Sequence, residues 1–224
     1  RRSTPAMGYQ FDWSVLLTYR HLLWHGLILT VQISAASMAA SLVLGSLIGV
    51  GRRSEVRWLR WALGAYVEFF RNVPLIVQLF FWYFGAGLET WPASVLGLTF
   101  YTSAYIAEVV RAGLQSIPRA QTEAARSFGM TAFQVVRHVI FPQALMRIVP
   151  PLAIEFINVV KNSSIAMTIG LAELTFQTQQ IEAQTFRGFE AATAITLLYV
   201  VLAFAVVVAM GWLERALRLE LRIG

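Results

Sequence analysis

Long stretches without charge constrain the fold of this chain more than any other feature. From His21 to Gly51 there is no Asp, Glu, Lys or Arg, and four further apolar runs follow. Of the 224 residues, 57% are hydrophobic and 13% are charged, whereas about a quarter of a soluble domain is charged. So little polar surface cannot cover a globule in water, and the chain is predicted to be a polytopic membrane protein.

Five of the apolar runs are long enough to cross a bilayer as helices. A hydrocarbon core about 30 Å thick needs about 20 helical residues at ~1.5 Å each. The predicted spans are residues 24–50, 62–86, 92–112, 146–171 and 191–213. The expected fold class is therefore an all-α polytopic membrane protein with five transmembrane helices.

Arginine is distributed unevenly between the loops. Twelve basic residues lie on one side of the predicted spans and four on the other. The twelve are Arg52, Arg53, Arg57, Arg60, Arg111, Arg119, Arg126, Arg137, Arg147, Arg215, Arg218 and Arg222, and the four are Arg1, Arg2, Arg20 and Arg187. Because cytoplasmic loops retain Lys and Arg, the amino terminus is expected outside and the carboxyl terminus inside. The net charge of +6 thus indicates membrane orientation rather than binding of nucleic acid.

The regions outside the spans are expected to be short. Residues 22–215 form a single transmembrane domain, and residues 216–224 form a cytoplasmic tail. Residues 1–21 form an outer segment, in which aromatic residues recur from Tyr9 to Trp24. This segment suits an amphipathic helix in the outer interface, and an irregular extension of the first span is the alternative.

A polar insert, residues 117–142, separates the third and fourth apolar runs and is expected to face the cytoplasm. Ser116 is predicted to cap a helix that begins near Pro118, where a missing N–H costs nothing. Gly129 fits the end of that helix. The insert is therefore expected to be helical, and an ordinary amphipathic loop is the alternative.

A second short helix is expected after Gly129. Thr131 and Gln134 have the spacing of a capping box, and Pro142 is predicted to end or kink the helix that they begin. Two helices joined by a bend would present small residues and the carboxylate of Glu123 to a basic partner.

The order of residues in the insert also matches a known motif. It resembles the EAA loop of binding-protein-dependent ABC import permeases, in which Glu-Ala-Ala is followed at fixed spacing by Gly, Ile and Leu-Pro. The matching residues are Glu123, Ala124, Ala125, Gly129 and Pro142. Val139 and Phe141 stand where the motif has Ile and Leu, which are mild departures.

Three further segments extend this resemblance. They are residues 68–75 (Glu-Phe-Phe-Arg-Asn-Val-Pro-Leu), residues 108–121, and residues 150–171 with Lys-Asn-Ser and Ile-Gly-Leu. Together they resemble the polar amino acid subfamily of ABC permeases (histidine, glutamate, glutamine, arginine and relatives). The resemblance runs from about residue 26 to 215 and implies the type I ABC importer permease fold.

The resemblance also implies partners and a location. Two copies of an ATP-binding subunit would dock on the insert, and a second permease subunit, identical or homologous, would complete the path. A periplasmic or lipid-anchored binding protein would deliver the amino acid. The complex would lie in a bacterial cytoplasmic (inner) membrane and import a polar or charged amino acid.

The chain itself is not expected to be an enzyme. It has no Gly-x-x-x-x-Gly-Lys-Ser/Thr loop, so ATP and Mg²⁺ are expected on the partner ATPase and no cofactor on this chain. It has no cysteine, and its three histidines lack ligand spacing, so no metal site is expected.

Charged residues within the spans are candidates for the transport path, because each costs on the order of 3 kcal/mol to insert. Glu68 and Arg71, like Glu108 and Arg111, are three residues apart on one helix face. Structural ion pairs, or snorkelling near the inner interface, are the alternative for both pairs.

A polar stripe follows in the fourth span. It consists of Glu155, Asn158, Lys161 and Asn162. A free amino acid brings a carboxylate and an ammonium, and each needs a partner out of water. Lys161 or Arg71 is expected to receive the carboxylate, and Glu155 or Glu68 the ammonium. Contacts between helices at a dimer seam are the alternative role for the stripe.

Other classes of protein fit less well. An ion-coupled secondary transporter would show more spans and inverted repeats, and a channel subunit would not explain the insert. An intramembrane hydrolase could use Ser163 or Ser164, but no histidine follows His25 in any apolar run.

Overall fold

The computed structural model describes residues 9–223, with the side chains of residues 9–217. Residues 1–8 of the predicted outer segment, with Arg1 and Arg2, lie outside the described residues, as does Gly224. The described chain consists of helices and the turns that connect them. Their bounds are α1 (Ser14–Thr18), α2 (Arg20–Gly51), α3 (Arg57–Asn72), α4 (Leu75–Phe80), η1 (Phe81–Gly85), α5 (Thr90–Gln115), α6 (Arg119–Ser127), α7 (Ala132–Val135), η2 (Val136–Ile140), α8 (Phe141–Asn162), η3 (Ser163–Ile169), α9 (Leu174–Thr185) and α10 (Gly188–Ile223).

The expected all-helical fold is confirmed, with four helices long and apolar enough to cross a membrane among the described residues. They are Arg20–Gly51, Thr90–Gln115, Ala132–Ile169 and Gly188–Leu217. They correspond to the first, third, fourth and fifth predicted spans.

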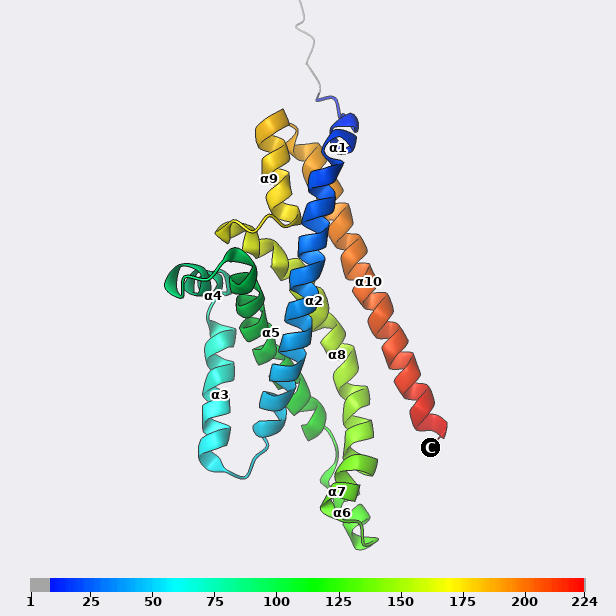
Figure 1. Cartoon of the computed structure of the whole chain (residues 1–224). Coiled ribbons are helices and arrows are strands. Elements are labelled where there is room, and N and C mark those ends of the chain that lie inside the picture. Colours follow the sequence, from blue (N-terminus) through cyan, green and yellow to red (C-terminus); the bar gives the residue numbers. More distant parts are fainter. Residues whose placement is uncertain (1–8, 224) are drawn as a thin grey trace, which may run out of the picture.

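The predicted span over residues 62–86 is not one continuous helix. Helix α3 ends at Asn72, and Val73 is extended with φ −88° and ψ 124°. Pro74 causes the break, because it donates no hydrogen bond and disfavours helical geometry in the preceding residue. The buried Gln78 amide compensates by donating to the carbonyls of Phe70 and Val73, at 3.0 Å each. After the break, α4 and the π-helical turn η1 lie across the end of α3 (Figure 1).

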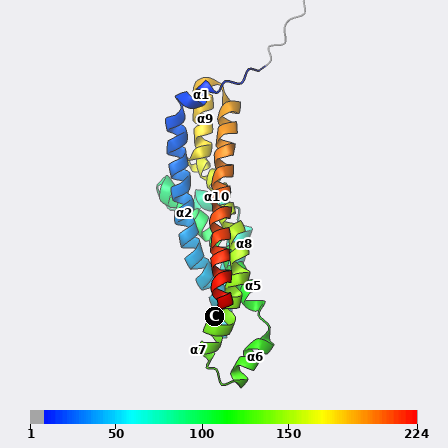
Figure 2. The same ribbon diagram turned by 90° about the vertical axis from the view of Figure 1, so that its right-hand side faces the viewer.

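The helices form an elongated bundle with distinct ends. Helices α6 and α7, the α2–α3 connection and the carboxyl end of α10 lie at one end, and α1 and α9 lie at the other (Figures 1 and 2). The segments predicted to share the arginine-rich side thus lie at the same end of the molecule.

Helices α2 and α5 approach closely because small residues line their contact. A Cβ added at Gly45 would lie 2.7 Å from the Ser103 carbonyl oxygen, and one at Gly49 would lie 2.7 Å from that of Ala107. Glycines four apart let helix backbones meet in a membrane, where packing replaces the hydrophobic effect. This contact places α5, which carries half of the polar cavity described below.

We therefore expect Gly45→Val to destabilise the fold by about 1–3 kcal/mol, because the new side chain forces α2 and α5 apart. Gly211→Val is the matched control, since a Cβ at Gly211 meets nothing within 4 Å. The measurement is the midpoint temperature for loss of the monodisperse species in detergent. Equal midpoints for the two variants would contradict the close contact.

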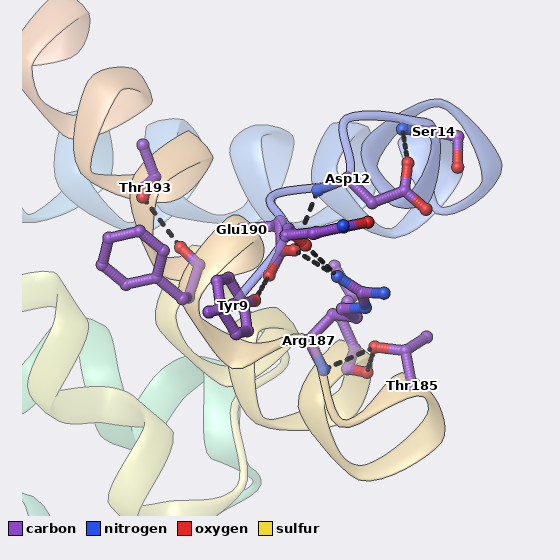
Figure 3. A network of polar contacts seen from close by, with 10 residues as sticks. Tyr9, Asp12, Ser14, Thr185, Arg187, Glu190 and Thr193 are labelled. Atoms are coloured by element: carbon purple, nitrogen blue, oxygen red, sulfur yellow. Dashed lines mark hydrogen bonds and ion pairs between the residues drawn. The ribbon is translucent and has the colours of Figure 1, made fainter. Parts of the chain in front are cut away.

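A polar cluster at the other end fixes the amino-terminal segment to α10 (Figure 3). The Glu190 side chain is fully buried. It accepts hydrogen bonds from the Tyr9 hydroxyl and from the Asp12 backbone N–H (3.1 Å), and it pairs with Arg187 (3.1 Å). Arg187 also donates to the Gln10 carbonyl oxygen at 2.5 Å. The hydrogen bond to Glu190 raises the pKa of the Tyr9 hydroxyl, assisted by partial burial, so this hydroxyl stays a donor at neutral pH.

Two helices begin within residues 9–24, for which an interfacial helix and an irregular extension of the first span are the alternatives. Helix α1 has only five residues and is followed by α2 after Tyr19, and the two run on end to end (Figure 1). Placement of this segment in the outer interface stays a prediction.

Candidate functional site

The insert begins with α6, which is not capped as expected. Pro118 is the residue before its first turn, whereas Ser116 keeps helical backbone angles at the end of α5. The Ser116 hydroxyl consequently donates back to the Gly113 carbonyl oxygen at 2.7 Å. The prediction that Ser116 caps the insert helix was wrong, because this local bond within α5 uses its hydroxyl.

The bend after α6 depends on Gly129, as expected. Gly129 has φ +81°, a left-handed conformation that side chains disfavour. Its N–H donates to the Arg126 carbonyl oxygen (2.9 Å), and the Met130 N–H donates to that of Ala125 (3.2 Å). These two bonds define a Schellman motif, which satisfies carbonyls at the helix end.

The second insert helix begins at the predicted capping box and then continues into the membrane. The Gln134 N–H donates to the Thr131 hydroxyl (3.3 Å), and the Thr131 N–H donates to the Gln134 side chain (2.8 Å). Pro142 does not end this helix. One π-helical turn, in which the Phe141 N–H donates to the Val136 carbonyl oxygen, precedes it and accommodates the ring. The helix from Ala132 to Ile169 is continuous as a candidate span.

The insert exposes aromatic side chains together with charges of both signs. Glu123 and Ala124 are exposed, and Phe128 and Phe133 are 89% and 71% exposed. Ala125 is buried, so of the two alanines only Ala124 is open to close approach by another chain. Large apolar side chains that project into water at the tip of a molecule indicate a protein interface.

A polar cavity of about 300 Å³ lies between α5 and α8. Its lining residues are Tyr101, Thr102, Tyr105, Glu155, Asn158 and Asn162. The hydroxyls of Tyr101 and Tyr105 lie 3.3 Å apart. The structure thus brings together three of the six predicted path residues, all from α8, opposite hydroxyls from α5.

The other three predicted path residues lie elsewhere. Arg71 is at the cavity edge, with its guanidinium 5.3 Å from the centre of the Tyr105 ring. Glu68 is exposed, and its carboxylate lies 3.4 Å from the Asn72 amide rather than paired with Arg71. Lys161 is exposed and does not line the cavity.

Glu108 and Arg111 form an ion pair, which is the alternative to a role in the transport path. Arg111 lies 2.6 Å from the Glu108 carboxylate, which also pairs with Arg52, the residue that follows α2. A carboxylate between two guanidiniums is fully engaged and ties α2 to α5.

The cavity has the groups that a zwitterion needs. Glu155 offers a carboxylate, the two asparagines offer both donors and acceptors, and Arg71 offers a cation at the edge. An amino acid out of water would therefore find partners for both of its charged ends.

Two polar features of the structure were not expected from the sequence. The first is the set of cavity residues from α5, which are Tyr101, Thr102 and Tyr105. A polar face within an apolar run could have identified them from the sequence. Glu173 is fully buried and caps α9, accepting from the Thr175 and Phe176 N–H groups at 2.9 Å and from the Tyr199 hydroxyl at 2.5 Å. An acidic residue directly before the helical run that begins at Leu174 was the available signal for this cap.

Comparison with known proteins gives consistent matches. Residues 41–219 match the family model described as binding-protein-dependent transport system inner membrane component. The chain is 39% identical over 209 residues to the probable glutamine ABC transporter permease protein GlnM of Bacillus subtilis (strain 168), covering 91% of this chain and 97% of that protein. It is 36% identical over 244 residues to the glutamate/aspartate import permease protein GltJ of Escherichia coli (strain K12), covering 97% and 99%.

Solved structures agree. A crystal structure of an amino acid ABC transporter with histidines matches with a TM-score of 0.85 and 33% identity, covering 93% of this chain and 100% of that chain. An inward-facing structure of the MetNI methionine ABC transporter matches with a TM-score of 0.75 and 26% identity, covering 89% and 98%.

Proposed function

Because the chain belongs to the family of binding-protein-dependent transport system inner membrane components, we propose that it is the permease subunit of an ATP-driven amino acid importer. The observation that carries this proposal is the exposed insert, whose aromatic residues Phe128 and Phe133 project from the arginine-rich end. Such a surface fits a soluble subunit that binds and hydrolyses ATP.

The coupling residues proposed on this surface are those of the Glu-Ala-Ala motif. Glu123 and Ala124 are exposed and would contact the ATPase, while Gly129 fixes the bend between α6 and α7. Ala125 and Pro142 would act by packing the insert against the membrane part of the chain. ATP and Mg²⁺ would be held by two ATPase copies.

The proposed topology has five crossings of a bacterial cytoplasmic membrane, with the amino terminus outside. The second crossing is made by α3, α4 and η1 together, broken at Pro74. A second permease subunit, identical or homologous, would complete the complex, and a periplasmic or lipid-anchored binding protein would deliver the substrate.

The proposed substrate is a polar or charged amino acid, and the cavity between α5 and α8 supports this choice. Glu155 would receive the ammonium, and Arg71 at the cavity edge would receive the carboxylate. The relatives named above are described as glutamine and glutamate/aspartate permeases, so these amino acids are the first to test.

The test combines copurification and uptake. The tagged chain is coexpressed with an ATPase and a binding protein encoded beside it, then reconstituted in vesicles with labelled L-glutamine or L-glutamate outside. We expect the ATPase to copurify and uptake to require internal ATP. Uptake driven by an ion gradient in the absence of the ATPase would contradict the proposal.

A further inference from the structure

Helix α3 carries two exposed strips of opposite character. The α3 polar strip consists of the exposed Arg57, Arg60, Glu68 and Arg71 and the half-buried Gly64, and the α3 apolar strip consists of Trp58, Ala62, Ala65 and Phe69. The exposed Trp61 lies between the two strips. At 3.6 residues per turn, each strip occupies about a quarter of the helix circumference. The remaining face packs through Leu63, Tyr66, Val67 and Phe70 against residues of α2 and α5.

The half of the α3 polar strip from Gly64 to Arg71 lies within the predicted second span. Helix α3 runs beside α2 and α5, both candidate spans (Figure 1). Glu68 and Arg71, which lie within the predicted second span, would each cost on the order of 3 kcal/mol against hydrocarbon, and Arg60 and Arg57 continue the strip to the arginine-rich end. The α3 apolar strip, where Trp58 and Phe69 are 71% and 60% exposed, suits lipid instead. The α3 polar strip therefore requires water or another polar surface.

The upper end of the α3 polar strip meets the polar cavity. Arg71 stacks on Tyr105, which lines that cavity beside Glu155. From Arg71 to Arg57 the strip extends about 21 Å toward the arginine-rich end, at ~1.5 Å per residue. A Cβ at Gly64, halfway along, would meet nothing within 4 Å, so the middle of the strip is open.

Resting on the function proposed above, we propose that the α3 polar strip lines the water-filled inner half of the transport path, from the cavity to the cytoplasm. The strip carries three cations and one anion, so it attracts the carboxylate of the departing amino acid. Arg71, Arg60 and Arg57 offer successive partners for that carboxylate, and Glu68 keeps any one of them from holding it tightly.

Single cysteines test this inference, because the chain has none of its own. Gly64→Cys lies on the α3 polar strip, and Ala65→Cys, its matched control, lies on the α3 apolar strip at the same depth. Both variants are made in the complete complex and exposed in inside-out vesicles to the charged reagent sulfonatoethyl methanethiosulfonate. We expect labelling at position 64 to be faster than at 65 by about tenfold or more, since only a thiol in water ionises readily and meets a charged reagent. Labelling at 64 should also block uptake.

Two results would overturn the inference. One is equal, slow labelling at both positions, and the other is an oxidative disulfide between two copies of Gly64→Cys that protects the thiol, which would place the strip at a seam between permeases. Uptake is measured before labelling, so either result beside normal ATP-dependent uptake leaves the importer proposal intact. Loss of ATP dependence in the unsubstituted complex would instead contradict the importer proposal, whatever the labelling.

Discussion

Replacing Gly129 with valine should strongly reduce ATP-driven uptake while the protein still reaches the membrane. Gly129 has φ +81°, and a Cβ there would meet nothing within 4 Å. The free-energy cost of the substitution therefore comes from the backbone conformation and not from clashes with neighbouring atoms. A left-handed conformation costs a side-chain-bearing residue about 1–2 kcal/mol, and a β-branched residue is an outlier there. The bend would open, α6 would lose its fixed direction relative to α7, and we expect uptake to fall by about tenfold or more.

Gly87→Val is the control for this prediction. Gly87 has φ +68°, and a Cβ there also meets nothing, so the backbone cost is similar, but the residue lies far from the insert. Uptake by Gly87→Val should exceed that of Gly129→Val, and Gly129→Asn should recover part of the activity because Asn tolerates this conformation. Equal losses at positions 87 and 129 would show a general effect of strain rather than a coupling role.

Replacing Glu155 with glutamine should impair uptake and leave assembly with the ATPase intact. Glutamine fills the same volume but offers no charge to the substrate ammonium in the cavity. Removing one partner of a desolvated charge pair costs about 2–5 kcal/mol, so uptake at low substrate should fall about 30-fold or more. The measurement is initial uptake rate against substrate concentration in vesicles.

Lys161→Gln is the matched control, less than two helical turns further along the chain. Lys161 is exposed and outside the cavity, so uptake by this variant should stay within about twofold of the unsubstituted protein. Normal transport by Glu155→Gln, or equal losses in both variants, would argue against the cavity as the substrate site.

Much of the architecture was predictable because a membrane helix can be recognised from one continuous apolar stretch of sequence. A stretch without charge such as residues 21–51 has few alternatives in hydrocarbon, where every backbone group needs an internal partner. The capping box at Thr131 and the bend at Gly129 were also predictable, since each depends on residues three or four apart. Pro74 was the signal for the break after Asn72. The apolar run over residues 62–86 indicated only that the segment is long enough to cross the membrane, not that it forms one continuous helix.

The cavity was only half predictable for a geometric reason. Glu155, Asn158 and Asn162 share one helix face, which spacing alone reveals. Tyr101 and Tyr105 come from another helix, and their position opposite α8 depends on tertiary packing that no local pattern encodes. Lys161 had suitable spacing and chemistry, yet its side chain turns away from the cavity, because a hundred degrees of rotation per residue separates it from Asn162.

The helix from Ala132 to Ile169 is continuous, so it connects the insert mechanically to the polar cavity. The amino-terminal part of this helix forms half of the insert. Glu155 lies about 35 Å along the helix from Ala132, at ~1.5 Å per residue. A tilt of the insert would reach the polar cavity directly, because one continuous helix joins the two and no loop lies between them. Under the proposed function, a motion of the ATPase would reach the cavity through this helix, and the π-helical turn η2 and the prolines inside α8, Pro150 and Pro151, are the points at which the helix can bend.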